Sequence, residues 1–451
     1  MIFSATVVRR ALLLCAWCAA AFAATRLLAT PRLPGESSRL LVPPIALAIA
    51  ALFAPASPRF RLCSAEAAAC VGGQAAALVH AHVWLLGVIG VYAGTSRVAG
   101  MARLVAVAVV IAAVRIALFH GAGRVARSLG GPLGLGAAGA AISLVDSAVH
   151  VLVPWYEPLT LASCSADIPG ALQLIHMGGF ELRSNGRRGA GHRRGPRRRE
   201  EHGRRDHPAA ALALLGGRTP SSSGESIVMD MIQLDPPAET SGWREEKVAK
   251  LVNAEPTSDA IKVWPEAAYP FIEPLQAGGT PAHLPCPIGG ERIFGMLARG
   301  AGGVIRNLVV VQPRCGAAGG VAMRSKEIPA PFREQERLDT TSIAPRALLV
   351  RGVPIALPIC YEILSRRFFR GTSARLVVNI SADGFDPTGT ASRHLTRAAW
   401  LRAVELGVPV VRVSDTRSSA FDARGRDITP HATSSHVVQV RVRTPPPSGG
   451  T

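Results

Sequence analysis

Acidic residues are nearly absent from the first third of the chain, and apolar stretches fill most of it. Residues 1–156 hold three acidic side chains, Glu36, Glu66 and Asp146, and arginines separate many of the apolar stretches. A helix needs roughly 20 apolar residues to cross the hydrocarbon layer of a membrane. We therefore predict a membrane region over residues 1–182, with about five membrane helices near residues 11–29, 40–57, 75–94, 102–119 and 132–155.

The first apolar stretch permits a second interpretation. It follows Arg9 and Arg10, so it suits a signal peptide as well as a membrane anchor, although the later apolar stretches favour the anchor. Arginines in the intervening loops are too evenly divided to orient the helices by the positive-inside rule. Five crossings that start in the cytoplasm would place the rest of the chain on the far side of the membrane.

A strongly basic segment follows the apolar region. Residues 183–205 contain ten arginines against Glu200 and Glu201, and the whole chain has a formal net charge of +19. Such charge favours anionic lipid or nucleic acid in general, and it indicates no specific nucleic acid as a partner. Residues 183–225 show neither helical nor strand periodicity. We interpret them either as a disordered basic linker or as the product of a reading-frame slip in a GC-rich gene.

From residue 226 the pattern changes to strands and helices. Helices are predicted at 243–252 and 392–406. Strands are predicted at the apolar runs 227–234, 260–264, 307–311, 346–350, 354–359, 376–380, 408–414 and 436–442. Strands that alternate with helices and hairpins indicate a layered α/β domain. We therefore predict one catalytic domain over 226–442, followed by a loose tail at 443–451.

The eight cysteines do not have the spacing of a metal site. Cys15 and Cys18 form a C-x-x-C pair, but this pair lies in an apolar run. Small buried thiols pack there like apolar side chains, so we interpret the pair as structural.

Three residues near predicted strand ends have side chains suited to catalysis, and α/β folds place active groups at such ends. Glu266 follows the strand that ends at residue 264, and a carboxylate there suits a general base. Lys326 precedes a proline-stiffened loop, where a fixed ammonium would stabilise an oxyanion. Cys360 follows an apolar strand and opens a predicted helix, whose N-terminus is expected to lower the pKa of the thiol and activate it as a nucleophile. Taken singly, the three residues also suit a solvated glutamate, an exposed lysine and a buried structural cysteine.

The sequence motifs around these residues resemble those of the nitrilase superfamily, whose members use Glu, Lys and Cys in this order along the chain. The resemblance is closest to the apolipoprotein N-acyltransferases, which are membrane members. Their motifs W-P-E-[TA]-A-x-P, K-x-x-L-V-P-F-G-E and I-C-Y-E correspond to WPEAAYP (264–270), KEIPAPFRE (326–334) and ICYE (359–362). Their N-x-S-x-D text corresponds to NISADGFD (379–386). The resemblance is good over 226–442 and weaker before residue 182.

The resemblance implies a fold, a site and a reaction. The implied fold is a four-layer αββα sandwich, and the implied catalytic residues are Glu266, Lys326 and Cys360, with Glu334 and Glu362 orienting the lysine and the thiol. The implied reaction moves an acyl chain from a phospholipid to the N-terminal cysteine amine of a diacylglyceryl lipoprotein, through a Cys360 thioester and without a metal or organic cofactor. The implied location is the bacterial inner membrane, crossed several times, with a periplasmic catalytic domain.

Several positions depart from the family's pattern. Arg333 stands where the family has glycine, and Gly384-Phe385 stands where the family has an aromatic residue beside its loop aspartate. The membrane helices that the family has after residue 182 and at its end have no counterpart in this sequence. Two other interpretations therefore stay open: a carbon–nitrogen hydrolase that acts on a small amide, and an inactive membrane protein. Nitrilase-like proteins encoded with conjugal-transfer genes fit the missing last helix.

Overall fold

The computed structural model describes residue 19, residues 65–82 and 97–129, and most of residues 224–446. Within the last range, the residues not described are 234–242, 275–283, 301–302, 318–319, 331–333, 335–337, 385, 387–388 and 431–436. The predicted basic linker lies outside the described residues except for its last two positions, 224 and 225. The predicted membrane helices at 40–57 and 132–155 lie wholly outside them, as does 11–29 except for residue 19.

Two helices of the front region are described, α3 (Ala65–His82) and α5 (Arg97–Leu129). They pack against each other through small and aliphatic side chains that include Ala75, Leu78 and Ala112. α5 contains the whole of the predicted membrane helix at 102–119, whereas α3 ends partway through the prediction at 75–94. No helix in the described part of the chain is both long enough and apolar enough to cross a membrane.

The region predicted as the catalytic domain contains two β-sheets. The first has seven strands in the order β12–β1–β2–β4–β5–β6, with β3 paired to β4. Its strands are β1 (Ser226–Ile232), β2 (Ile261–Val263), β3 (Tyr269–Pro274), β4 (Arg292–Arg299), β5 (Ile305–Gln312), β6 (Ala322–Ser325) and β12 (Val437–Arg443). β2 runs parallel to β4, and β5 is antiparallel to both β4 and β6. β6 therefore runs in the same direction as β2, so the carboxyl ends of these two strands lie at the same edge of the sheet.

The second sheet has five strands in the order β11–β10–β9–β8–β7. They are β7 (Ala347–Val350), β8 (Val353–Ala356), β9 (Leu376–Ser381), β10 (Val410–Ser414) and β11 (Ser419–Phe421). The three central strands β8, β9 and β10 are parallel. Parallel strands buried on both faces are apolar almost throughout, which explains why the Val-rich and Ile-rich runs of β9 and β10 are continuous.

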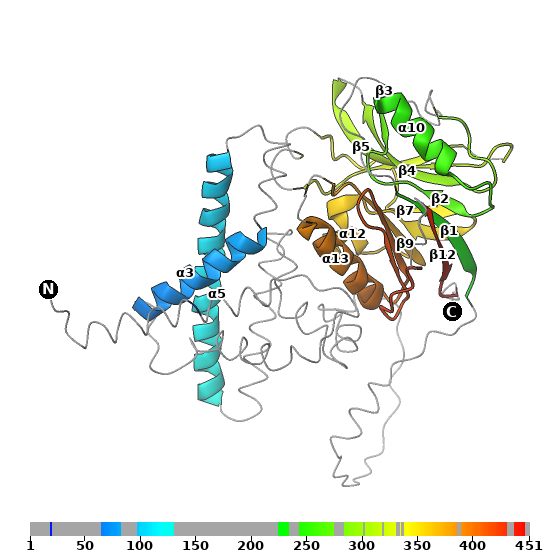
Figure 1. The fold of residues 1–451 in the computed structure, drawn as a ribbon. Coiled ribbons are helices and arrows are strands. Elements are labelled where there is room, and N and C mark those ends of the chain that lie inside the picture. Colours follow the sequence, from blue (N-terminus) through cyan, green and yellow to red (C-terminus); the bar gives the residue numbers. More distant parts are fainter. Residues whose placement is uncertain are drawn as a thin grey trace, which may run out of the picture.

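The two sheets and their helices form four layers (Figure 1). Alternate residues of β9 show the arrangement: Leu376, Val378 and Ile380 pack with the first sheet, whereas Val377 packs with the helix α13 (Thr390–Leu406). On the outer face of the first sheet, α10 (Trp243–Ala254) contributes Val248 to a third apolar cluster. The order of layers is therefore α10, first sheet, second sheet and α13, as the αββα prediction required.

The predicted helices and most predicted strands agree with the structure to within two or three residues at their ends. β12 continues to Arg443, and Thr444 is buried, with its backbone N–H donating to the carbonyl of Glu225 at 2.9 Å. The start of the predicted tail at 443–451 thus packs on the domain, while residues 447–451 lie outside the described residues.

Candidate active site

Three strand ends bring Glu266, Lys326 and Cys360 together. Glu266 follows β2 and Lys326 follows β6, at the shared edge of the first sheet, and Cys360 follows β8 of the second sheet. The Nζ of Lys326 lies 3.1 Å from Oε1 of Glu266, and the thiol of Cys360 is hydrogen-bonded to Glu266. Glu266 and Lys326 are buried, and Cys360 is half-buried. The structure therefore gathers the three predicted residues, which lie up to 94 positions apart in the sequence.

The backbone around Glu266 bends closely against β4. The backbone pairing with β4 extends to Pro265, whose carbonyl accepts the N–H of Gly295 at 3.2 Å, and Ala267 has a positive φ of 50°, which marks a sharp turn for a residue with a side chain. Gly295 of β4 lies beneath this turn, where an added Cβ would be 2.6 Å from Cα of Glu266 and 2.5 Å from the backbone nitrogen of Ala267. A glycine at 295 is therefore needed to let Glu266 approach the sheet.

Three donors besides the Cys360 thiol hold the Glu266 carboxylate. Oε1 accepts hydrogen bonds from Nδ2 of Asn307 at 2.8 Å and from Nζ of Lys326, and Oε2 accepts one from the backbone N–H of Ala382 at 3.0 Å. Asn307 lies near the start of β5, whose antiparallel direction brings it to the same edge as the ends of β2 and β6. The carboxylate is thereby fixed as an acceptor beside the thiol.

Lys326 lies between two carboxylates. Glu334 contacts its Nζ with both oxygens at 3.0 Å and accepts a hydrogen bond from the backbone of Ala330 at 2.6 Å. Burial alone would lower the pKa of Lys326, but Glu266 and Glu334 outweigh burial and hold this pKa well above its usual value. The lysine is therefore a permanent cation that is held in contact with Glu334.

Cys360 occupies a sharp elbow. Its φ of 48° is left-handed, and a short 3₁₀-helix, η5 (Cys360–Leu364), begins at this residue. Nδ2 of Asn379 in β9 donates to the carbonyls of Pro358 at 2.9 Å and Cys360 at 3.3 Å, which fixes the turn. The thiol is therefore presented at the end of the second sheet towards Glu266 and Lys326.

The expected lowering of the Cys360 pKa is wrong. Burial and the neighbouring charge of Glu266 raise the pKa of the thiol well above its usual value, and the opposing effect of Lys326 is smaller than theirs. The predicted helix is in fact a five-residue 3₁₀-helix, which has too few aligned peptide dipoles to offset these effects. Cys360 is consequently a neutral thiol at rest, and its proton must be removed when it reacts.

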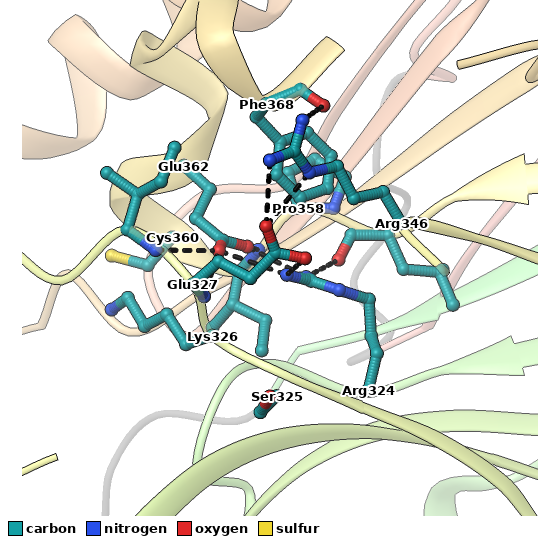
Figure 2. A network of polar contacts seen from close by, with 12 residues as sticks. Arg324, Ser325, Lys326, Glu327, Arg346, Pro358, Cys360, Glu362 and Phe368 are labelled. Carbon is teal, nitrogen blue, oxygen red and sulfur yellow. Dashed lines mark hydrogen bonds and ion pairs between the residues drawn. The ribbon is translucent and has the colours of Figure 1, made fainter. Parts of the chain in front are cut away.

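Glu362 connects the elbow to the lysine loop. Its fully buried carboxylate forms a two-pronged ion pair with Arg324 and accepts backbone N–H groups from Glu327, Ile328 and Ile359. Figure 2 shows this network, with the side chains of Cys360 and Lys326 pointing to the same side of it. Glu362 was predicted to orient the site, whereas Arg324 was not.

Asp383 and Asp415 form an acidic pair next to Ala382, whose backbone N–H donates to Glu266. Burial and the adjacent Asp383 raise the pKa of Asp415 to about 7. Burial opposes the ionisation of Asp383, but Arg412, Ser414 and Thr416 outweigh it and hold the pKa of Asp383 well below its usual value. Asp415 also accepts the backbone N–H of Asp383 at 2.8 Å, directly after the Ala382 N–H that contacts Glu266. In the described part of the chain, no three His, Cys, Asp or Glu side chains are grouped as metal ligands.

Several solved structures are similar to part of this chain. A carbon–nitrogen hydrolase from Helicobacter pylori aligns with 48% of this chain and 89% of its own, at 11% identity and a TM-score of 0.37. Nit3 of Saccharomyces cerevisiae, a nitrilase-superfamily member, aligns with 49% of this chain and 90% of its own, at 16% identity and a TM-score of 0.37. XC1258 of Xanthomonas campestris, described as a CN-hydrolase superfamily protein, aligns with 48% and 90%, at 15% identity and a TM-score of 0.39.

One stretch of this chain is similar in sequence to a known protein. Apolipoprotein N-acyltransferase of Bradyrhizobium diazoefficiens is 38% identical to it over 86 residues, which are 18% of this chain and 16% of that protein. The match therefore spans about one sixth of the relative's length. No family model matches the chain.

Parts of this site were missing from the sequence prediction. Asn307 was predicted only as the first residue of a strand, and Arg324 and Asp415 were not predicted as site residues. Asn307 and Arg324 lie on β5 and β6 and contact residues 41 and 38 positions away. A signal for Arg324 exists in hindsight, because it is a lone charge in a short strand only two positions before Lys326.

Proposed function

We propose that the chain is a membrane-bound acyltransferase, which moves an acyl chain from a phospholipid to the N-terminal cysteine amine of a diacylglyceryl lipoprotein. The observation that carries the proposal is the meeting of a half-buried thiol, a buried carboxylate and a buried ammonium at three strand ends. Such a set supports nucleophilic acyl chemistry with Cys360 as nucleophile, Glu266 as general base and Lys326 as the oxyanion-binding cation.

The first half-reaction forms a thioester. Glu266 takes the proton of Cys360 while the sulfur attacks the carbonyl carbon of the phospholipid ester. Lys326 stabilises the negative oxygen of the tetrahedral intermediate, and its raised pKa keeps it charged throughout. The carbon–oxygen ester bond then breaks, the lysophospholipid alkoxide takes the proton from Glu266, and the acyl group stays on the sulfur.

The second half-reaction forms the product amide. The free α-amine of the lipoprotein attacks the thioester carbon, and Glu266 takes a proton from the attacking nitrogen. The carbon–sulfur bond breaks, and the leaving sulfur recovers that proton from Glu266. The neutral thiol is restored, so each cycle returns the site to its starting protonation.

The nature of the acceptor and the location are supported by features outside the triad. The stretch that is 38% identical to an apolipoprotein N-acyltransferase supports an amine acceptor. The long apolar stretches of the first 156 residues, with their three acidic side chains, support attachment to a membrane. A disulfide between Cys286 and Cys315 supports a catalytic domain on the oxidising, periplasmic side, because disulfides are rare in the cytosol.

The test offers the purified full-length protein a phospholipid with a labelled acyl chain and three acceptors. These are a lipopeptide with a free diacylglyceryl-cysteine amine, the same lipopeptide with that amine acetylated, and a small amide. We expect label to be transferred to the free amine and not to the acetylated one, with no transfer by Cys360→Ala. Hydrolysis of the small amide without acyl transfer would favour a carbon–nitrogen hydrolase instead, and inertness towards all three would contradict both.

A further inference from the structure

Arg324 is a buried cation two positions before Lys326. Its side chain is completely enclosed, and its two terminal nitrogens contact the two carboxylate oxygens of Glu362 at 2.8 and 3.0 Å. The first nitrogen also donates to the carbonyl of Leu357 at 2.6 Å, and the guanidinium lies 4.8 Å from the ring centre of Phe368. An arginine fork held at both ends in this way fixes an angle as well as a distance.

The contacts of Glu362 bracket both reacting side chains. On the lysine side, Glu362 accepts the backbone N–H groups of Glu327 at 2.6 Å and Ile328 at 3.1 Å, the two residues after Lys326. On the nucleophile side, it accepts the N–H of Ile359 at 2.8 Å, the residue before Cys360. Arg324 lies two positions before Lys326, and its partner Glu362 binds the backbone of the two residues that follow Lys326 (Figure 2).

The arrangement links two sheets that share no strand. β6, which carries Arg324, belongs to the first sheet, whereas Leu357 and Ile359 continue β8 of the second sheet. The separation between the Lys326 ammonium and the Cys360 thiol therefore depends on how the two sheets are held at this edge. The Arg324–Glu362 pair and its backbone contacts span that junction.

We propose that Arg324 is a positioning residue: through Glu362 it sets Lys326 at the distance from Cys360 at which the lysine charge acts on the sulfur and on the oxyanion. The inference rests on the proposed acyl chemistry at Cys360. A merely structural pair would contribute to folding and leave the ionisation of the thiol unchanged. A positioning pair also controls the thiol, because the Lys326 charge favours the thiolate.

The domain contains a matched control pair. Arg292 and Glu255 are also buried and doubly hydrogen-bonded, and the Arg292 guanidinium lies 4.8 Å from the ring centre of Trp264. This pair contacts Pro285 and Gln312, and within the described part of the chain it forms no hydrogen bond or ion pair with Lys326, Cys360 or the residues that flank them. Its loss should cost the protein similar stability without moving the reacting groups.

The experiment compares Arg324→Lys and Arg324→Met/Glu362→Gln with Arg292→Lys and Arg292→Met/Glu255→Gln in the full-length protein. The lysine variants keep a positive charge, and the double variants leave no lone buried charge, so both designs limit unfolding. Three quantities are measured: the melting temperature, the pH dependence of Cys360 alkylation by iodoacetamide, and kcat and KM for acyl transfer.

We expect the Arg324 variants to shift the alkylation profile to higher pH and to lower kcat about 10- to 100-fold, with KM changed less than about threefold. The Arg292 variants should keep the wild-type profile at a similar loss of melting temperature. The proposal is overturned if both pairs change the profile alike, if neither changes it, or if every Arg324 variant loses its fold while the Arg292 variants keep theirs. Because alkylation needs no substrate, a shifted profile in a protein that transfers no acyl group would reject the proposed function and leave the positioning role standing.

Discussion

At the scale of single residues, the site combines a neutral nucleophile with a permanent cation. Burial and Glu266 raise the pKa of Cys360, and the same carboxylate, together with Glu334, overcomes burial to raise the pKa of Lys326. The sulfur therefore depends on a base at the moment of attack, and the lysine cannot serve as that base because it stays protonated. Glu266, which contacts both groups, is the residue that can move the proton.

The raised thiol pKa predicts a steep pH dependence of chemical labelling. Only the thiolate reacts quickly with iodoacetamide, so Cys360 should react slowly at pH 7 and progressively faster as the pH rises above 9. The rate is measured by mass spectrometry of the peptide that contains residue 360. A rate that is high and constant between pH 6 and 9 would show a preformed thiolate and contradict the assignment of Glu266 as base.

Replacing Lys326 by methionine tests the cation directly. The variant loses the charge that holds the oxyanion, so kcat should fall by about 10²- to 10³-fold. Lys262→Met is the matched control, because Lys262 is also fully buried and donates to the carbonyls of Ser258 and Ile288 at 2.7 Å. Both variants should lose stability, and activity per folded molecule should fall in the first variant alone. Equal activity in the two would remove Lys326 from the mechanism.

Asp415 makes stability depend on pH in a defined direction. Its folded pKa of about 7 lies above the usual 3.8, so its contribution to stability is complete below about pH 4 and is lost as the pH rises through about 7. Asp415→Asn keeps an acceptor for the backbone of Asp383 without the titrating proton. We expect this variant to melt about 2–4 °C above the wild type at pH 8 and at the same temperature at pH 4. An equal difference at both pH values would contradict the role of the proton.

At the scale of elements, the β4–β5 hairpin supports Glu266 from below and is closed by a disulfide. Gly295 of β4 accommodates the Glu266 turn, Asn307 of β5 donates to its carboxylate, and Cys286 and Cys315 join the segments at the opposite end of the hairpin. The two cysteines lie 29 positions apart in the sequence. The disulfide therefore restricts the unfolded chain while lying away from the reacting atoms.

Breaking this disulfide should affect stability rather than chemistry. Cys286→Ser/Cys315→Ser is expected to lower the free energy of unfolding by about 3.5 kcal/mol, as for a loop of this length. At a temperature where both proteins are folded, acyl transfer should stay within about twofold of the wild type, because neither cysteine contacts the triad. Cys70→Ser, which replaces a buried cysteine of α3 outside the catalytic domain, is the control and should leave the stability of the domain unchanged.

Continuous apolar runs were predicted well, even around the buried Arg412 of β10, whereas β4 and β6, which also contain buried arginines, were missed. The runs at 376–380 and 408–414 became β9 and β10, whereas β4, β6, β3 and β11 were missed. β4 begins with Arg292 and β6 contains Arg324, and both arginines are buried because distant glutamates pair with them. Sequence alone cannot supply such partners, so a charged residue indicates an exposed position until the fold is known.

The same limit applied to the site. Local motifs were sufficient to single out Glu266, Lys326 and Cys360 as candidates, because each lies in a short sequence motif at a strand end. The direction of the Cys360 pKa was predicted wrongly, since burial and the approach of Glu266 exist only in the folded chain. The contacts of Asn307 and Arg324 were missed for the same reason.

At the scale of the whole molecule, our proposal assigns membrane attachment to the apolar front region and catalysis to the α/β domain. A phospholipid ester must reach Cys360 from a membrane, and a domain anchored beside that membrane shortens the path. We expect the full-length protein to stay in the membrane pellet after alkaline carbonate extraction and to be cleaved by protease added outside spheroplasts. Release into the supernatant would contradict the anchor, and protection from external protease in intact spheroplasts would contradict a periplasmic domain.

The central claim is that Cys360 carries the acyl group between donor and acceptor. The most direct measurement incubates the full-length protein with a labelled phospholipid in the absence of an acceptor and locates the label by mass spectrometry. We predict one hydroxylamine-sensitive acyl group on the peptide that contains Cys360, its loss when a lipopeptide with a free amine is added, and no label on Cys360→Ala. Label that persists in Cys360→Ala, or that resides on another residue, would contradict the account.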